Sequence, residues 1–233
     1  MTLAAILAGG SGARFGDSAL PKQFLDLGGR PVLARTAEKF LTHPGVAFVI
    51  VLCPGAWLSH TQSILAAAFG ADARVAVIEG GESRNDTLRR ALEYIDLRFG
   101  REDDHILLTH DAVRPFVTHR MIGGNIEAAA KYGACDTAIP ATDTIVESAD
   151  GRFISAIPER GRIFHGQTPQ SFRVNKLRAL MESLSAEEEA LLTDACKIFA
   201  LRGEPVALVA GEPRNIKITY AEDLKVAEAL IDR

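Results

Sequence analysis

The sequence predicts an α/β protein with a doubly wound, mostly parallel sheet, helices on both faces and a protruding β-arm. Short apolar runs alternate with amphipathic segments at intervals of roughly 25–30 residues, the order expected of strand–helix–strand units. Glycine or charged residues follow several of the apolar runs. Ligands of such sheets bind beyond the carboxyl ends of the strands, so these residues are the first candidates for a site. The 233 residues suit a single domain over residues 1–233, with the arm at about 142–164.

Five short apolar runs in the first part of the chain are predicted to be buried strands. The first stops at Gly9-Gly10 and the second at Pro54-Gly55, as expected where a strand enters a loop. The five strands are expected at residues 3–8, 48–53, 75–78, 105–109 and 135–140. Helices are expected between them, where apolar residues recur on one face, at 31–40, 58–69, 83–95 and 121–132.

Residues 142–164 break this alternation and predict two strands about a turn. Asp150-Gly151 is a strong hairpin signal. Two strands alone are marginal in water, so we expect the arm to pack on something else, a partner subunit being the natural candidate. Beyond the arm, helices are expected at 175–184, 187–202 and 221–231, and strands at 206–210 and 216–219.

The composition is that of a soluble protein. Apolar residues at 47% allow a sizeable core, and the net charge of -4 argues against a surface that coats nucleic acid. Cys53, Cys135 and Cys196 lie far apart without metal-ligand spacing, which favours free buried thiols in a reducing cytoplasm. The first apolar run is too short for a signal core or a membrane span. We therefore expect a cytoplasmic protein without nucleic-acid or membrane partners.

The first motif is a glycine-rich segment directly after the first predicted strand. Gly9, Gly10 and Gly12 allow backbone N–H groups to approach a phosphate, and Arg14 and Lys22 add positive charge beside them. The segment lacks the ending of a P-loop, and its glycine spacing does not fit the dinucleotide fingerprint. A triphosphate site is therefore favoured over a tight turn with surface cations.

A second glycine pair follows the third predicted strand. Gly80 and Gly81 can approach a base or ribose, and Thr87 offers a hydroxyl near the start of a helix. Ser83 or Asn85 could equally well cap the first turn of that helix. The pattern alone leaves both interpretations open.

The third motif places Asp111 and Arg114 at the end of the fourth predicted strand. A carboxylate in this position is well placed to hold Mg²⁺ against phosphate oxygens, because Mg²⁺ commonly combines one or two carboxylates with phosphate and water. Arg114 either clamps a substrate or braces Asp111, and His110 is expected to be structural or to orient the loop. Further along, Lys217 lies between apolar residues, which favours an anion-facing role.

Taken in order, AGGSGARFG, PKQF, GGESRNDT, THDAVRP, TDTI, GQTPQSF, TDACK and NIKIT resemble the motifs of the IspD/TarI cytidylyltransferases, from about residue 3 to residue 231. The resemblance implies a Rossmann-like nucleotidyltransferase fold, transfer of CMP from CTP to a polyol phosphate, release of pyrophosphate and use of Mg²⁺. It also implies a homodimer whose arms reach into the neighbouring sites.

Two branches of the family differ in their acceptor. One makes CDP-ribitol from D-ribitol 5-phosphate for teichoic acid or related polyols, and the other uses 2-C-methyl-D-erythritol 4-phosphate for isoprenoids. The Leu-Ala-Gly-Gly loop, Thr-His-Asp-Ala-Val-Arg and Thr-Asp-Ala-Cys-Lys look more like the ribitol branch. Ribitol 5-phosphate is therefore the expected acceptor, with methylerythritol 4-phosphate as the alternative.

The resemblance further implies a role for each matching position. Arg14, Lys22, Arg160 and Lys217 are implied to be catalytic, and Asp111 to be the metal ligand. CTP is implied to contact Leu7, Ala8, Gly9, Gly10, Gly12, Gly81, Glu82, Arg84, Asn85 and Thr87. The acceptor is implied to contact Arg114, Thr144, Thr168 and Asp194.

Two other classes of protein fit the motifs less well. A nucleotide-binding module without catalysis need not keep Arg14, Lys22, Asp111, Arg160 and Lys217 together. A dinucleotide-dependent oxidoreductase would require an acidic residue after the second strand, where this chain has Cys-Pro.

Overall fold

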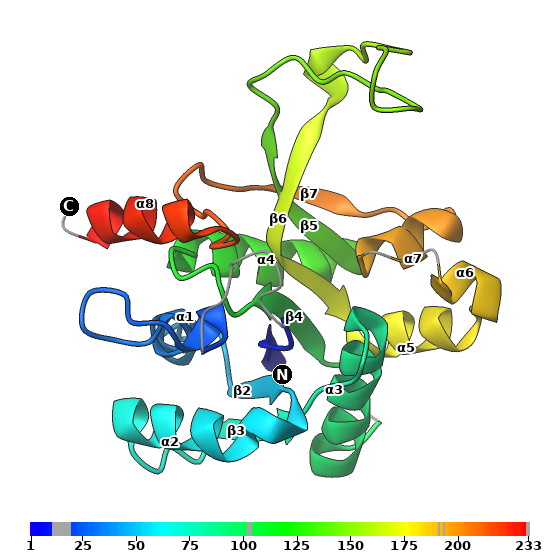
Figure 1. Ribbon diagram of the computed structural model, residues 1–233. Coiled ribbons are helices and arrows are strands. Elements are labelled where there is room, and N and C mark those ends of the chain that lie inside the picture. The colour runs from blue at the N-terminus through cyan, green and yellow to red at the C-terminus, as the bar shows by residue number, and fades with distance from the viewer. Residues whose placement is uncertain (11–19, 102–103, 191, 193, 232–233) are drawn as a thin grey trace.

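The computed structural model describes residues 1–10, 20–101, 104–190, 192 and 194–231, and these residues build a seven-stranded sheet of order β3-β2-β1-β4-β6-β5-β7 (Figure 1). Only β6 runs antiparallel to its neighbours among these strands, which confirms the predicted mostly parallel α/β fold. The strands are β1 (Thr2–Leu7), β2 (Phe48–Cys53), β3 (Val75–Glu79), β4 (Ile106–Asp111), β5 (Ala134–Pro140), β6 (Phe164–Arg173) and β7 (Ala207–Ala210).

Helices cover both faces of the sheet because successive residues of the central strands point to opposite sides. In β1, Leu3 and Ala5 belong to the core beneath α3, whereas Ala4 and Ile6 belong to the core beneath α1. The first face carries α3 (Arg84–Phe99), α5 (Val174–Glu182) and α7 (Cys196–Leu201), and the second carries α1 (Val32–Leu41), α2 (Leu58–Phe69) and α4 (His119–Tyr132). The remaining helical segments are η1 (Lys22–Phe24), η2 (Gly55–Trp57), η3 (Arg160–Arg162), α6 (Ala186–Ala190) and α8 (Ala221–Ile231).

Most predicted elements are confirmed with shifts of a few residues at their ends, and β2, α2 and α8 match their predicted ranges. The strand predicted at 216–219 is wrong. That segment makes no sheet pairing among the described residues; instead the amide of Ile218 donates to the carbonyl of Val113 over 3.0 Å. The segment is therefore fastened to the loop after β4 and does not extend the sheet.

The continuous helix predicted at 187–202 is also wrong. α6 ends at Ala190 and α7 begins at Cys196. Between them the carboxylate of Asp194 accepts a hydrogen bond from the amide of Cys196 over 2.6 Å, which is the action of a side chain that starts a new helical turn.

β6 is the strand that the sequence pattern did not predict. Its buried positions include Gln167, Thr168, Gln170 and Ser171, and it contains Pro169, so it has neither an apolar run nor a clean alternation. The buried polar groups find partners in neighbouring elements: Oγ of Ser171, for example, donates to Oδ1 of Asn125 over 3.0 Å. Partners of this kind are visible only once the fold is assembled.

The arm at 142–163 projects beyond the edge of the sheet, above β5 and β6 in Figure 1. The two strands predicted for it are wrong, because its sheet pairing is limited to a single bridge between Glu147 and Ala156. The expected turn is present: Oδ1 of Asp150 accepts from the amides of Arg152 and Phe153. Several apolar side chains of the arm and its base are exposed, namely Val146, Phe153, Ile154, Ile157 and Phe164.

The three cysteines are free thiols, as expected, with Cys53 and Cys135 buried and Cys196 partly buried. Burial raises the pKa of Cys135 to about 12, so this thiol stays protonated at neutral pH. Among the described helices, none combines the length and apolar character needed to cross a lipid bilayer.

Candidate functional site

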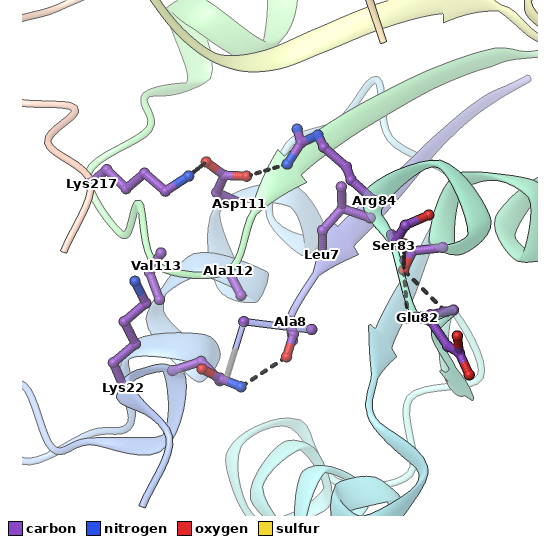
Figure 2. Close-up of a pocket in the computed structure, with 15 residues that line it drawn as sticks. Leu7, Ala8, Lys22, Glu82, Ser83, Arg84, Asp111, Ala112, Val113 and Lys217 are labelled. Atoms are coloured by element: carbon purple, nitrogen blue, oxygen red, sulfur yellow. Dashed lines mark hydrogen bonds and ion pairs between the residues drawn. The ribbon is translucent and has the colours of Figure 1, made fainter. Parts of the chain in front are cut away.

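A cavity of about 280 Å³ opens where the carboxyl ends of β1 and β4 meet the start of α3. This is the position expected for a ligand in an open α/β sheet. Two glycine loops and three cationic side chains contribute to its walls (Figure 2). The lining residues are Leu7, Ala8, Gly9, Gly10, Lys22, Gln23, Gly81, Glu82, Ser83, Arg84, Thr87, Asp111, Ala112, Val113 and Lys217.

The first wall is the loop after β1 together with η1. The side-chain amide of Gln23 donates to the carbonyl of Ala8 over 2.8 Å and ties η1 to the end of the strand. Lys22 is only 8% exposed, and its Cε lies 3.9 Å from where a Cβ on Gly10 would sit. The lysine is thus packed against the glycine loop, as expected for a cation that serves a ligand held by backbone amides.

The second wall is the loop before α3. Ser83 and Asp86 form a reciprocal capping box, in which the Asp86 amide donates to Oγ of Ser83 and the Ser83 amide donates to Asp86. The Gly81 amide donates to the hydroxyl of Thr87 over 3.1 Å. A Cβ on Gly81 would lie 2.1 Å from Cβ of Asp86, so only glycine fits. The capping interpretation is therefore confirmed for Ser83, and the same loop also lines the cavity.

Asp111, the last residue of β4, has cations against both carboxylate oxygens. Nη1 of Arg84 lies 2.8 Å from Oδ1, and Nζ of Lys217 lies 2.8 Å from Oδ2. Figure 2 shows these two side chains approaching the carboxylate from opposite sides. Burial would raise the pKa of the Asp111 carboxyl, but the charges of Arg84 and Lys217 outweigh it and hold that pKa below its usual range. Asp111 is therefore a fixed anion at neutral pH.

Arg114 braces this arrangement from behind. Its Nε lies 3.5 Å from Oδ2 of Asp111, and its Nη1 donates to the carbonyl of Asn215 over 2.8 Å. Its side chain is largely buried and is not part of the cavity lining. Of the two roles that the sequence left open for Arg114, the contacts in this structure are those of a brace for Asp111.

A buried chain of hydrogen bonds fixes the backbone of Asp111. Its amide donates to Oγ1 of Thr168 over 3.2 Å, and that hydroxyl lies 3.0 Å from Nδ1 of His110. Nε2 of His110 faces the carbonyl of Arg114 at 3.0 Å. Burial lowers the pKa of His110 to about 4, so the ring is neutral and can donate from Nε2 while accepting at Nδ1. His110 thus has the structural position expected of it.

The segment that carries Lys217 is pinned on both sides. Asn215 is fully buried, and its side-chain amide donates to Oε1 of Gln167 and to the carbonyl of Thr168. The Ile218 amide is held by the carbonyl of Val113. Between these anchors Lys217 projects into the cavity, although the strand that was expected to present it does not form.

The structure brings most of the predicted site residues together. Those that line the cavity are Leu7, Ala8, Gly9, Gly10, Lys22, Gly81, Glu82, Arg84, Thr87, Asp111 and Lys217. Gly12 and Arg14 lie outside the described residues. Six further predicted residues do not line the cavity: Asn85, Arg114, Thr144, Arg160, Thr168 and Asp194.

These six residues have other surroundings. Asn85 is buried behind the α3 loop, with its amide 3.4 Å from the carbonyl of Glu189. Thr144 and Arg160 are in the arm, where Nη1 of Arg160 donates to the carbonyl of Thr142 over 3.3 Å. Thr168 and Arg114 contact Asp111 from outside the cavity, and Asp194 accepts from the amide of Cys196 at the start of α7.

Four residues of the lining were not on the predicted contact list: Gln23, Ser83, Ala112 and Val113. Each lies within a recognised motif, next to a predicted residue. Closeness in sequence to Lys22, Arg84 or Asp111 could therefore have suggested these four residues. It does not reveal which neighbours of a predicted residue face the cavity.

The donor set of the cavity fits a hard cation that is bound mainly through a substrate. Among the described residues, no group of three metal-ligating side chains is present. Asp111 is a deprotonated carboxylate at the cavity wall, and its oxygens already accept from cations. One carboxylate, completed by phosphate oxygens and water, is a common environment for Mg²⁺.

Known proteins share both this fold and this sequence pattern. The structure of 4-diphosphocytidyl-2C-methyl-D-erythritol synthase from Anaerococcus prevotii is 27% identical, with a TM-score of 0.83 over 100% of this chain and 96% of that one. The 2-C-methyl-D-erythritol 4-phosphate cytidylyltransferase from Thermus thermophilus is 29% identical, with a TM-score of 0.74 over 100% of both chains. The 2-C-methyl-D-erythritol 4-phosphate cytidylyltransferase from Francisella tularensis is 26% identical, with a TM-score of 0.79 over 98% of this chain and 99% of that one.

Fold and site together therefore define a CTP-dependent cytidylyltransferase, which is an enzyme of the nucleotidyltransferase class. The family model described as IspD: 2-C-methyl-D-erythritol 4-phosphate cytidylyltransferase matches residues 2–233. The chain belongs to this IspD family.

Proposed function

We propose that this enzyme transfers CMP from CTP to the phosphate group of a short polyol phosphate and releases pyrophosphate. The observation that carries the proposal is the set of cations around Asp111, in a cavity bounded by two glycine loops. The lining of this cavity suits phosphate groups, since it offers backbone of the glycine loops, two lysines and an arginine.

CTP binds between the two loops. Gly9, Gly10 and Lys22 receive its phosphates, and the loop from Gly81 to Thr87 receives its cytidine. Arg14, outside the described residues, is implied by the family resemblance to act with Lys22 on the α-phosphate. Glycine is required at position 81 because a side chain there would collide with α3. Without a side chain, the backbone of this loop can approach the ligand closely.

The reaction is an in-line substitution at the α-phosphorus of CTP. An oxygen of the acceptor phosphate forms the new P–O bond, and the bond to the β-phosphate oxygen breaks so that pyrophosphate leaves with its electron pair. A phosphate monoester is already an anion near neutral pH, so no strong general base is needed. Lys22, Lys217 and Arg84 hold the two repelling anions together and stabilise the charge of the transition state.

Mg²⁺ is part of the proposal, with Asp111 as the protein carboxylate that would hold it. When bound, it would neutralise phosphate charge and favour departure of pyrophosphate. Arg84 and Lys217, which now contact Asp111, would then turn toward the substrate phosphates.

A homodimer with exchanged arms completes the site in this proposal. The exposed apolar side chains of the arm, such as Phe153 at 76% exposure, are costly to leave in water and suit burial against a second copy of the chain. Thr144 and Arg160 do not line the cavity of their own chain. We infer that they act on the acceptor in the partner's site.

Two acceptors are supported by different observations. The matched family model and the similar structures are those of methylerythritol 4-phosphate enzymes, which favours that acceptor. The Leu-Ala-Gly-Gly, Thr-His-Asp-Ala-Val-Arg and Thr-Asp-Ala-Cys-Lys motifs favour D-ribitol 5-phosphate. Free thiols and the use of CTP favour a cytoplasmic reaction in either case.

The deciding experiment measures pyrophosphate release from CTP and Mg²⁺ with each acceptor in parallel. A ratio of kcat/KM above about 10 identifies the preferred acceptor, since it corresponds to more than about 1.4 kcal/mol of transition-state discrimination. If a folded protein binds CTP but releases no pyrophosphate with either acceptor, or with other short polyol phosphates, the proposed function is contradicted.

A further inference from the structure

Beside the described cavity lies a second polar cluster, built from β5, β6 and the start of α7. The side-chain amide nitrogen of Gln170 donates to two carboxylates at once, to Oδ1 of Asp136 over 3.2 Å and to Oδ2 of Asp194 over 2.6 Å. A single neutral amide thus holds two acidic groups close to each other. Desolvation is the main cause that raises the pKa of Asp136 to about 7, and the charge of Asp194 adds to it.

The cluster is incomplete in the described chain. Gln170 is only 2% exposed, and its Oε1 is buried without a hydrogen-bond partner from any described residue. A buried amide oxygen in this state costs about 1–3 kcal/mol relative to one that is satisfied. Asp136 also keeps acceptor capacity, because each carboxylate oxygen can accept two hydrogen bonds. Among the described residues, what is missing is a donor to Oε1 of Gln170.

The cluster lies next to the reacting groups. Gln170 is paired with Thr109 of β4, two residues before Asp111, and with Asp136 of β5. Alternation along the strands puts these side chains on the face of the sheet that also carries Arg84 and Asp111. Asp136 is close enough for the charge of Arg84 to act on its carboxyl, which supports the same placement.

Gly166 of β6 lies beside the carboxylate of Asp136. A Cβ at this position would lie 3.5 Å from Oδ2 of Asp136, so the carboxylate rests against a residue without a side chain. On the other side, Oδ1 of Asp194 is occupied by the amides of Cys196 and Lys197, which fixes that carboxylate in place. The hydrogen-bond acceptors of the cluster are therefore held in place before a ligand binds.

We propose that Asp136, Gln170 and Asp194 form the subsite for the polyol chain of the acceptor, whose hydroxyl groups donate to the Asp136 carboxylate and to Oε1 of Gln170. This inference rests on the proposed function and extends it to the recognition of the acceptor. The acceptor phosphate lies at Lys217 and Arg84, and its carbon chain runs from there along β6 toward Asp136.

The subsite selects an unbranched polyol chain that offers a hydroxyl, and not a methyl group, to Asp136. A methyl branch facing Asp136 would add no donor to the one that Gln170 already supplies, whereas a hydroxyl would donate to the remaining acceptor positions of this partly buried carboxylate. A site built to hydrogen-bond a hydroxyl discriminates strongly against a ligand that lacks it. D-Ribitol 5-phosphate fits this chemistry better than 2-C-methyl-D-erythritol 4-phosphate.

The test compares the wild-type enzyme with Asp136→Asn and Asp194→Asn. Asparagine keeps the size of each side chain, and at position 194 it keeps an oxygen for the start of α7. Asp104→Asn is the matched control, since Asp104 is an exposed carboxylate that contacts Arg173 of β6 away from the cavity. KM for CTP and kcat/KM for ribitol 5-phosphate, methylerythritol 4-phosphate and glycerol 3-phosphate are measured for each.

We expect Asp136→Asn to lower kcat/KM for ribitol 5-phosphate by about 10- to 100-fold while KM for CTP changes less than about threefold. The preference for ribitol 5-phosphate over glycerol 3-phosphate should fall by a similar factor, which a general loss of folding would not produce. An unchanged preference in both folded asparagine variants overturns the inference.

Equilibrium binding separates this inference from the proposed function. Calorimetry in the presence of CTP and without Mg²⁺ compares ribitol 5-phosphate with inorganic phosphate. Tighter binding of ribitol 5-phosphate, lost in Asp136→Asn, supports the subsite even if no acceptor is turned over. Binding no tighter than that of inorganic phosphate overturns it, even if the enzyme proves to be a cytidylyltransferase for another acceptor.

Discussion

Nζ of Lys217 lies 2.8 Å from Oδ2 of Asp111 and joins the segment before α8 to the end of β4. The two side chains differ in exposure, at 38% for Lys217 and 9% for Asp111. The carboxylate is therefore held by the protein, whereas the lysine can leave it for a ligand in the cavity. In the proposed reaction, substrate phosphates would compete with Asp111 for Lys217, and the cation would already be in position before CTP binds.

Replacement of Lys22 by alanine should leave the fold intact and reduce kcat by about 10²- to 10³-fold, since one positively charged donor to the transition state is lost. Steady-state pyrophosphate release measures the effect, with circular dichroism to confirm folding. Lys225→Ala, which removes an exposed lysine of α8, is the control and should retain wild-type rates. Near-normal turnover of a folded Lys22→Ala enzyme would remove Lys22 from the catalytic groups.

Asp111→Asn should destabilise the protein at neutral pH by about 1–3 kcal/mol, because Arg84, Arg114 and Lys217 lose their anion. The pKa of Asp111 is lowered in the folded state, so its stabilising contribution exists above the unfolded pKa and is lost as the pH falls. Urea unfolding at pH 7, 5 and 4 should show the gap between wild type and variant narrowing below about pH 5. A gap that stays constant over this range would contradict the interpretation.

Asp136→Asn should have the opposite dependence on pH. The pKa of Asp136 is raised to about 7, so the folded protein holds a proton there that the unfolded chain releases near pH 4. The stability from this group is present at low pH and is lost as the pH rises through about 7. Between pH 5 and pH 8 the free energy of unfolding of the variant should therefore rise relative to that of the wild type, by about 1–3 kcal/mol at pH 8. Chemical denaturation at both pH values measures the gain.

The groups that act on Asp136 set the size of this effect. Besides desolvation, the charge of Asp194 raises its pKa, while Gln170 and Arg84 lower it. Asp194→Asn should accordingly reduce the pH dependence of wild-type stability. A pH dependence unaltered by both substitutions would show that Asp136 titrates normally.

Gly81→Ala should weaken both the protein and its affinity for CTP. The new Cβ would lie 2.1 Å from Cβ of Asp86 and 2.8 Å from the Thr87 amide, so the loop or the first turn of α3 must move. We expect a loss of about 1–3 kcal/mol in unfolding free energy and a KM for CTP raised about tenfold or more. Gly123→Ala is the matched control, since its Cβ would meet only Nε2 of His43, at 3.5 Å, and alanine favours a helix.

Exchange of arms can be tested by mixing two inactive variants, Lys22→Ala and Arg160→Ala. If Arg160 acts in the partner's site, the mixed dimer has one site with both groups intact. Random association after refolding together should then restore about a quarter of the wild-type activity. No recovery in mixtures shown to contain mixed dimers would place Arg160 in its own chain's site or outside catalysis.

Much of the fold follows from local patterns. The apolar run of β2 and the periodic apolar face of α2 are properties of adjacent residues, and both elements were predicted with their observed bounds. β6 was missed because Gln167, Gln170 and Ser171 are polar and yet buried. Their burial is possible only because partners from α4, β5 and the segment near Asn215 lie beside them.

The sequence by itself determined the alternating α/β pattern, the two glycine loops and the residue types that handle phosphate, since each of these depends on near neighbours along the chain. It did not determine that Arg84 and Lys217 would meet at one carboxylate, or that Asp136 and Asp194 would share the amide of Gln170. Those contacts join distant parts of the chain. They depend on the order and direction of the strands. Only the assembled sheet decides that order, because helices must pack on both of its faces.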